Sequence, residues 1–360
     1  MHNFIEYIFY NVWCKAPSTQ YGITLFEGLP ELYMIMGELF KKELAEQLKG
    51  SGAFFYESVN AIFDQFKNLD AGEIQQMKDA FAANNNIEQA CLDVQHPITV
   101  YDSFIVKNKP LVDEIKSFFK EIYSSGFWNL KVVEKTIGST LGDYYNDFVE
   151  INEQGVCPFC GILPMDSEHD PTREAFDHYL PKSKYPFNSV NLKNLAPSCH
   201  KCNSGNKRDK DPLIKGTQRR KAFYPFSSQS PDTEVTLTVV NKVWDRPLPE
   251  NFSIEITSEA YPDEVETWKE LFCIEKRYLA KCCSSLGYKP WLNRIFDESR
   301  NCKLTVAEIL KEELRFAEKN PFSDAGFLRK SFLEACDKAG LFNYDTDVVV
   351  EPEPVIEGAA

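Results

Sequence analysis

Four cysteines in two closely spaced pairs are the residues of this sequence best suited to chemistry. Cys157 and Cys160 form the first Cys-x-x-Cys pair, and Cys199 and Cys202 form the second. Two-residue spacing lets both thiolates of a pair reach one metal ion, and four sulfurs make a closed tetrahedral zinc site. The 38 residues between the pairs exceed the usual zinc-ribbon spacing, so we expect a structural zinc ion to clamp the base of a long insertion. Two disulfides, or two unrelated pairs of buried thiols, are the alternatives.

The insertion carries an adjacent acid and imidazole, Asp177 and His178, followed by Pro181. On a strand, neighbouring side chains point to opposite faces, but twist and turn at a strand end can bring both to one cleft. A carboxylate there suits Mg²⁺, which prefers oxygen ligands, and a neutral imidazole suits the activation of water. Asn203 directly follows the fourth cysteine, so a zinc ion would fix it relative to the insertion.

These segments resemble the HNH endonucleases of the ββα-metal fold, particularly the members with a zinc-clamped motif. The match spans about a seventh of the chain and rests on the segments CPFC (157–160), DHYLP (177–181), NLKNLAP (191–197) and CHKCNSGNK (199–207). The resemblance implies that His178 is the general base of phosphodiester hydrolysis and that Asn194 orients it. It also implies that Asp177 and Asn203 hold a catalytic Mg²⁺ or Mn²⁺ ion. We expect His200 to be solvent-exposed or to face phosphate rather than to be catalytic.

Cations are concentrated next to this segment, although the chain of 360 residues has a net charge of −14. Residues 182–221 contain eleven Lys and Arg against two Asp, a local charge of +9. A basic strip that begins at the candidate site is the electrostatic footprint of phosphate binding. An ordinary solvated face is the alternative. We expect the nucleic-acid contacts to come from Lys201, Lys207, Arg208 and Lys210.

Long segments on both sides of the insertion have helical periodicity. Apolar residues recur at helical spacing in residues 31–49, 54–66, 73–83, 111–123, 264–286, 305–319 and 324–339. Thr305 and Asp324 are the expected N-caps, and Gly287 and Gly340 the expected ends. Residues 233–240 and 252–256 alternate apolar and polar, which predicts two strands or a hairpin.

The predicted fold class is therefore α+β, a mostly helical chain with a central zinc-clamped ββα-metal module and a small β element after it. The predicted regions are a helical adaptor (1–150), the HNH module with its structural zinc (151–215), a β element with a helical C-terminal region (216–345) and an acidic tail (346–360).

Together these features predict a metal-dependent HNH endonuclease, a hydrolase that cuts nucleic acid, with DNA as the expected polymer. The surroundings LPKSKYP and CNSGNKRDK are also similar to HNH effectors of bacterial anti-phage systems, such as the HNH partner of an ATPase in Septu and retron systems. That similarity implies a role in antiviral defence under the control of a partner protein, such as an ATPase subunit. The alternative function is a non-catalytic zinc-ribbon module that binds nucleic acid or protein.

Composition indicates the compartment. The eleven cysteines, an odd number, fit a reducing environment. The sequence has no apolar run long enough to span a membrane and no basic leader. The expected location is therefore cytoplasmic, with no membrane partner.

Overall fold

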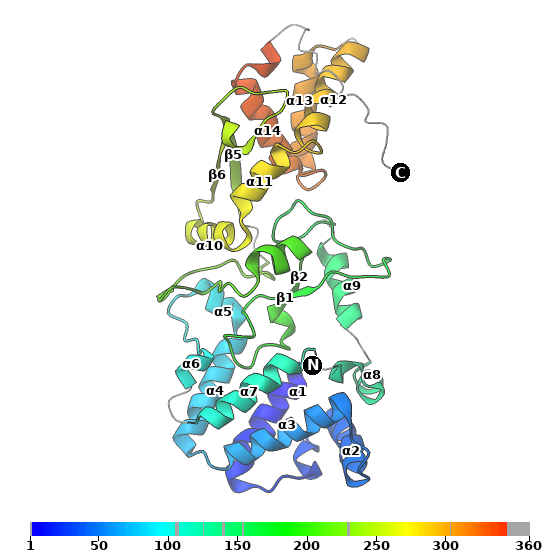
Figure 1. Cartoon of the computed structure of the whole chain (residues 1–360), viewed down its shortest axis with the longest axis vertical. Helices are drawn as coiled ribbons and strands as arrows, with labels where there is room; N and C mark the ends of the chain where they lie inside the picture. The colour runs from blue at the N-terminus through cyan, green and yellow to red at the C-terminus, as the bar shows by residue number, and fades with distance from the viewer. Residues whose placement is uncertain are drawn as a thin grey trace. The chain divides into compact units, whose positions relative to one another are not determined.

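The chain forms two compact units in the computed structural model, Met1–Ser230 and Pro231–Ala360, called here the N-terminal unit and the C-terminal unit. The structure describes residues 2–104, 108–124, 126–138, 141–152, 155–228, 231–302 and 304–343, and the predicted acidic tail (346–360) lies outside them. Helices predominate in both units, and the sheets are small antiparallel pairs (Figure 1). This confirms the α+β class. Within the described ranges, every helix is too short or too polar to cross a membrane.

Helices of the N-terminal unit surround a core rich in aromatic side chains. They are α1 (His2–Tyr7), α2 (Pro30–Leu44), α3 (Gly50–Phe66), α4 (Ala71–Asn85), α5 (Ile87–Leu92), α6 (Tyr101–Phe104), α7 (Lys109–Glu121), α8 (Lys131–Ile137) and α9 (Leu141–Asn152). The predictions for α3, α4 and α7 are confirmed. Helix α4 begins with a capping box in which Asp70 and Glu73 each accept from the other's backbone N–H. Helix α2 ends earlier than predicted, and Glu46 just beyond it has a left-handed φ of 55°.

A loop of the predicted nuclease module completes this helical core. Phe187 and Val190 are fully buried among the core residues, and the Phe187 ring lies 5.2 Å from Phe9 and 5.4 Å from Phe81 between ring centres. The Asn84 amide of α4 also donates to the Pro186 carbonyl at 3.2 Å. The predicted boundary at residue 150 therefore does not separate two cores, because the adaptor and the module share one.

The central hairpin consists of β1 (Phe176–His178) and β2 (Leu195–Pro197), paired antiparallel with Asp177 opposite Ala196. Phe176 and Leu195 pack with Tyr145 of α9 in a second, smaller core. The Tyr144 hydroxyl of α9 donates to the Leu192 and Leu195 carbonyls. A π-helical turn (Lys201–Lys207) follows, and then a two-residue pairing of β3 (Ile214–Lys215) with β4 (Gln218–Arg219). Helix α9 thus packs against the hairpin through Tyr144 and Tyr145.

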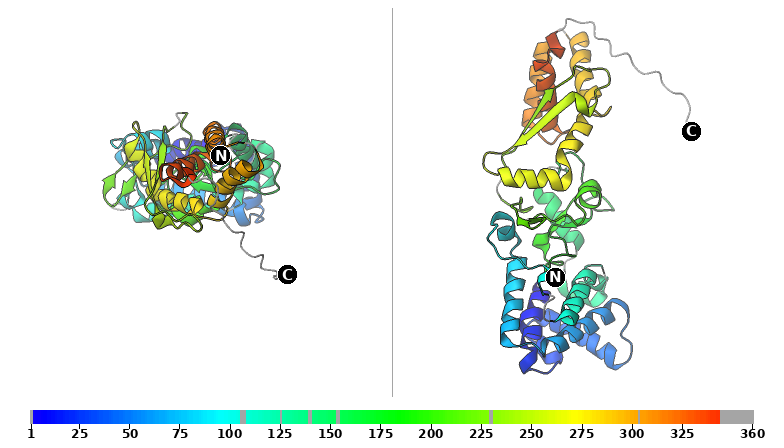
Figure 2. Two further views of the ribbon diagram at one scale, coloured as in Figure 1. Left: turned by 90° about the horizontal axis from the view of Figure 1, so that it is seen from above. Right: turned by 60° about the vertical axis from the view of Figure 1, so that its left-hand side comes forward.

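In the C-terminal unit a two-stranded hairpin packs on a helix. Strands β5 (Glu234–Val239) and β6 (Phe252–Thr257) pair antiparallel, as predicted, and lie against α14 (Figure 2). The helices are α10 (Pro262–Phe272), α11 (Ile274–Cys282), α12 (Tyr288–Asn301), α13 (Val306–Lys319) and α14 (Gly326–Lys338).

Three details of this unit correct the sequence prediction. The helix predicted at 264–286 is broken at Cys273, whose φ of 53° is left-handed. Gly287 precedes α12 and does not end α11. Asp324 is not an N-cap, because its carboxylate accepts from the Trp291 indole at 2.8 Å. The Thr305 cap is confirmed by a full capping box.

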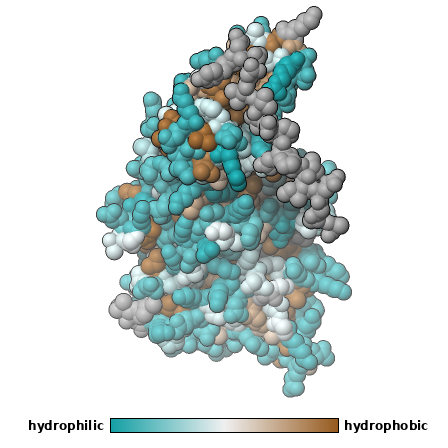
Figure 3. Space-filling view, turned by 45° about the horizontal axis from the view of Figure 1, so that its top comes forward, coloured by the Kyte–Doolittle hydropathy of each residue, from teal (hydrophilic) through white to brown (hydrophobic). Residues whose placement is uncertain are grey.

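Apolar side chains on the surface are scattered. The face drawn in Figure 3 is mostly hydrophilic, with small separate apolar patches. The largest exposed fractions among the apolar residues are those of Ile151 (84%) and Leu286 (79%). Isolated exposed apolar residues are normal for a folded chain and need no partner to explain them.

Candidate functional site

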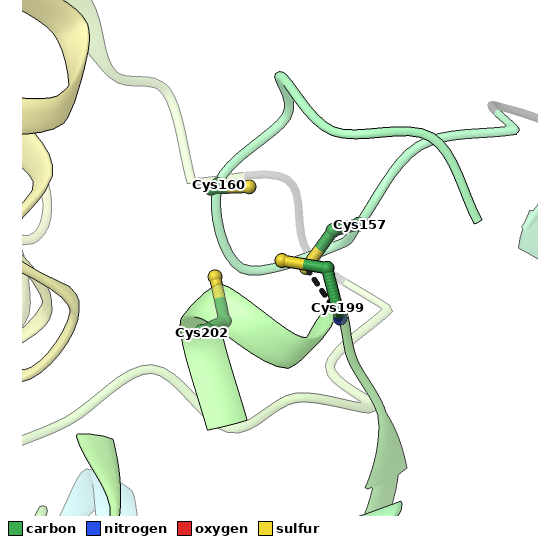
Figure 4. A group of neighbouring side chains, drawn as sticks. All are labelled: Cys157, Cys160, Cys199 and Cys202. Carbon is green, nitrogen blue, oxygen red and sulfur yellow. Dashed lines mark hydrogen bonds between the residues drawn. The ribbon is translucent and has the colours of Figure 1, made fainter. Parts of the chain in front are cut away.

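The four predicted zinc-binding cysteines come together in one buried cluster. Their sulfur atoms all lie within 4.8 Å of one another, and the side chains converge from a loop and from the start of the π-helical turn (Figure 4). No disulfide joins any of the described cysteines. Four converging thiols are a donor set that suits zinc, so the cluster could hold such an ion.

Each Cys-x-x-Cys pair sits in a tight backbone turn. In the first turn, the N–H groups of Cys160 and Gly161 donate to the Cys157 carbonyl at 3.2 and 2.8 Å. Gly161 adopts a φ of 64°, which glycine reaches without steric cost. In the second turn, the N–H groups of Cys202 and Asn203 donate to the Cys199 carbonyl at 2.9 and 3.0 Å. Local sequence therefore forms each half of the cluster.

The two halves are linked directly, because the Cys199 N–H donates to the Cys157 sulfur at 3.4 Å. The crowded thiols also perturb each other. A hydrogen bond from Cys157 is the largest cause lowering the pKa of Cys160, and Cys157 is likewise the largest cause raising the pKa of Cys202. A bound cation would favour the thiolate form at all four positions.

Asp177 is buried in the hairpin and forms an ion pair with Lys207. Its Oδ1 lies 3.0 Å from the Lys207 ammonium, which also donates to the His178 carbonyl at 2.9 Å. Burial raises the pKa of the Asp177 carboxyl and lowers that of the Lys207 ammonium, and each partner opposes the shift of the other. The second carboxylate oxygen, Oδ2, is buried with no hydrogen-bond partner.

The prediction that Lys207 contacts nucleic acid is wrong. Its side chain is 0% exposed, so no phosphate can reach it. The physical reason is that the end of the π-helical turn faces β1, where the buried Asp177 carboxylate attracts the Lys207 ammonium. Lys207 thus stabilises the hairpin from inside.

His178 is half-buried at the end of β1, and its ring is fixed at one nitrogen. Nε2 lies 2.9 Å from the Ser189 carbonyl oxygen. A carbonyl only accepts, so Nε2 carries the proton and Nδ1 of the neutral ring keeps its lone pair. Burial is the main cause that lowers the pKa of His178 to about 3, with the charge of Lys182 contributing. The imidazole is therefore neutral at physiological pH.

The hydrogen bonds of the Asn194 side chain go to the backbone, so any orienting effect on His178 is indirect. The Asn194 Oδ1 accepts from the Leu180 N–H at 2.7 Å, and its Nδ2 donates to the carbonyls of Leu180 and Asn188 at 3.0 and 3.3 Å. Asn188 directly precedes Ser189. Asn194 therefore closes the loop that presents the Ser189 carbonyl, and it acts on His178 through that loop.

Asn203 lies beside β1, with its Nδ2 3.4 Å from the Phe176 carbonyl. Its Oδ1 accepts no hydrogen bond within the described part of the chain. Together with the bare Oδ2 of Asp177, this gives two unpartnered oxygens next to the same strand, the donor type that Mg²⁺ and Mn²⁺ prefer. The donor types suit such an ion, while the Asp177 carboxylate is itself buried and paired with Lys207.

The other predicted cations lie farther out. Lys201 and Arg208 are exposed, Lys210 is half-buried, and His200 is exposed as expected. Arg219 is not a surface cation, because its guanidinium donates to the carbonyls of Ala90 and Asp93 behind α5. The basic strip of the sequence is thus divided between structural and solvent-facing side chains.

Three residues near His178 were absent from the predicted site. Ser189 contributes a backbone carbonyl, which no sequence pattern reveals. Tyr123, just after α7, meets the His178 ring edge-on at 4.6 Å between ring centres. Lys182 lies over Tyr123, with its Nζ 5.2 Å from the ring centre. Its place four residues after His178, at the start of the basic strip 182–221, was the available signal.

Comparison with known proteins gives one partial relative. The chain is 39% identical over 83 residues to "Protein ea31" of Escherichia phage lambda. The match covers 23% of this chain and 24% of that protein, so it spans about a quarter of the relative. Protein-family models give no match, and neither do solved structures.

Proposed function

We propose that this chain is a metal-dependent endonuclease of the HNH type that hydrolyses phosphodiester bonds of DNA. The observation that carries the proposal is the state of His178. The hydrogen bond to the Ser189 carbonyl leaves Nδ1 as a bare acceptor, one residue after a buried carboxylate with an unpartnered oxygen. A buried carboxylate oxygen without a hydrogen-bond partner costs free energy. A purely structural role for His178 would not explain why the neighbouring Asp177 keeps such an oxygen.

In this mechanism the residues of the chain position and activate a water molecule. His178 Nδ1 accepts a proton from water, and the resulting hydroxide attacks phosphorus in line with the leaving oxygen. The Ser189 carbonyl holds the ring and stabilises the imidazolium as it forms. A divalent ion held by Asp177 and Asn203 would stabilise negative charge on the phosphate.

The cysteine cluster supports the same proposal by fixing the geometry. Cys199 and Cys202 lie directly between β2 and Asn203, so a zinc ion there would set the distance from Asn203 to β1. Zinc has no role in the proton transfer under this proposal. Its contribution is to prevent the hairpin and the π-helical turn from separating.

The test is cleavage by His178→Ala compared with wild type. The variant should retain zinc content, circular dichroism and melting temperature while Mg²⁺- or Mn²⁺-dependent cleavage of plasmid DNA falls by about 10²- to 10⁴-fold, the usual contribution of a positioned base. His200→Ala is the matched control, because this exposed histidine lies in the same module and should cut at the wild-type rate. The assay includes any protein that co-purifies from native cells.

A folded His178→Ala protein that cuts like wild type would reject the nuclease assignment for this site. The remaining interpretation would then be a zinc-ribbon module that binds nucleic acid or protein. That module uses the cysteines but has no use for the free Nδ1 of His178.

A further inference from the structure

Lys182 is a cation beside His178 that the mechanism above does not use. It follows Pro181, whose carbonyl accepts two backbone N–H groups at 2.9 and 3.1 Å, so a tight turn sets the position of its backbone. The side chain is half-buried. Its ammonium lies over the ring of Tyr123, which also contacts the ring of His178. Tyr123 therefore brings the lysine and the histidine to one place.

The charge of Lys182 has no acidic partner in the part of the chain that the structure describes. Its Nζ donates instead to the Lys120 carbonyl at 3.1 Å, in the last turn of α7. Carbonyls at a helix C-terminus carry partial negative charge, so this helix end substitutes for a counter-ion. Two neighbouring lysines do have acid partners, namely Lys207 (3.0 Å from Asp177) and Lys184 (3.9 Å from Asp211).

A second cation, Lys120, acts on the charge of Lys182. Burial is the largest cause lowering the pKa of Lys182, and the charge of Lys120 lowers it further. The exposed Arg173 lies over the ring of Phe176 and near enough to Tyr123 to lower the pKa of that tyrosine. A half-buried ammonium among like charges binds an anion more strongly than an exposed lysine does.

We propose that Lys182 binds a DNA backbone phosphate next to His178, an inference that rests on the proposed nuclease function. The Lys120 carbonyl occupies one of the three ammonium N–H groups, so two remain for phosphate oxygens. The aromatic ring of Tyr123 limits where the ammonium can move. Lys182 thus takes the role that the sequence pattern assigned to Lys207.

The experiment measures binding and cleavage separately for Lys182→Met, Lys182→Gln and Lys184→Met. Binding of a fluorescein-labelled DNA duplex is followed by anisotropy over a range of NaCl concentrations in EDTA. Loss of one phosphate contact should reduce the slope of log K against log salt by about one and weaken binding. Lys184→Met removes a lysine from the same turn, and it should retain the wild-type slope.

The Gln variant excludes a structural explanation. Its amide, one bond shorter than the lysine ammonium, still offers a donor toward the Lys120 carbonyl but carries no charge. If Lys182 merely capped α7, Lys182→Met would melt at lower temperature while both variants kept the wild-type salt slope, and the proposal would be overturned. Reduced slopes in both variants at unchanged zinc content would establish the contact.

Cleavage in Mg²⁺ distinguishes the two proposals. Wild-type protein that binds DNA with the expected Lys182 dependence but never cuts it would refute the nuclease function and leave the phosphate contact standing. Wild-type protein that cuts, together with charge-neutral variants that bind and cut at the wild-type rate, would refute the role of Lys182 alone.

Discussion

Phe187 is the side chain through which the hairpin loop is anchored in the helical core, so its truncation should affect both stability and the site. Its ring is 0% exposed and lies 5.2 Å from Phe9, 5.4 Å from Phe81 and 5.5 Å from Phe119 between ring centres. A buried Phe removes about 150–250 Å² from water, and at about 25 cal/mol per Å² this is worth about 4–6 kcal/mol. Because Ala keeps the Cβ, we expect Phe187→Ala to cost about 3–5 kcal/mol.

The backbone of Phe187 adds a sharper expectation, since its φ of 77° is left-handed. Ala at this position keeps the steric cost of a Cβ, about 1–2 kcal/mol, whereas Gly does not. Phe187→Gly should therefore be about 1 kcal/mol more stable than Phe187→Ala, the reverse of the usual order of these two residues.

Hydrogen exchange of the α4 amides, measured by mass spectrometry, reports the free energy of unfolding of the N-terminal unit. A loss of about 4 kcal/mol should speed exchange through global opening by about 10³-fold. Phe322→Ala is the control, because this exposed phenylalanine lies in the C-terminal unit and should leave α4 unchanged. An exchange rate within about tenfold of this expectation is compatible with the reasoning. A Phe187→Ala protein whose α4 amides exchange as slowly as those of wild type would refute it.

Phe187→Ala should also affect the His178 site and the cysteine cluster differently. Phe187 precedes Ser189 by two residues, so loosening the loop should misplace the carbonyl that holds the His178 ring. The cysteine turns form from local hydrogen bonds and should keep their zinc. Folded Phe187→Ala protein is therefore expected to contain normal zinc and to lose cleavage. Loss of zinc together with cleavage would contradict this division.

Further predictions concern the cluster, the buried ion pair and acid sensitivity. Cys160→Ser should lower bound zinc, measured by elemental analysis, and make the hairpin sensitive to limited proteolysis; a variant with full zinc would exclude the cluster as its site. Lys207→Met should destabilise the protein by about 3–5 kcal/mol in urea, because Asp177 is left buried and unpaired, and adding Asp177→Asn should restore most of the loss. His178 has a pKa lowered to about 3, below the ordinary value of about 6.5, so the unfolded chain binds the proton first. The contribution of the neutral His178 ring to the free energy of unfolding is complete above pH ~6.5 and is lost as pH falls toward ~3. The free energy of unfolding should therefore drop less between pH 7 and pH 4.5 in His178→Gln than in wild type. The difference between the two drops should be about 1–2 kcal/mol, a range that takes the partial exposure of the ring into account.

Local patterns in the sequence determined the elements that depend on near neighbours. The capping boxes at Asp70 and Thr305 need only a second side chain three residues away. The cysteine turns likewise close over four residues, which is why their spacing predicted the cluster correctly. Period-two alternation was enough for β5 and β6, because each strand buries only one face.

Only the tertiary structure decided how the residues of the site are used. Lys207 looked like a surface cation in the sequence but meets a carboxylate 30 residues away inside the hairpin. The carbonyl that orients His178 belongs to Ser189, whose place depends on the packing of Phe187 in a core built by other helices. The burial of a charged side chain and the position of a backbone carbonyl carry no signature in residue type, because both depend on which distant segments fold against each other.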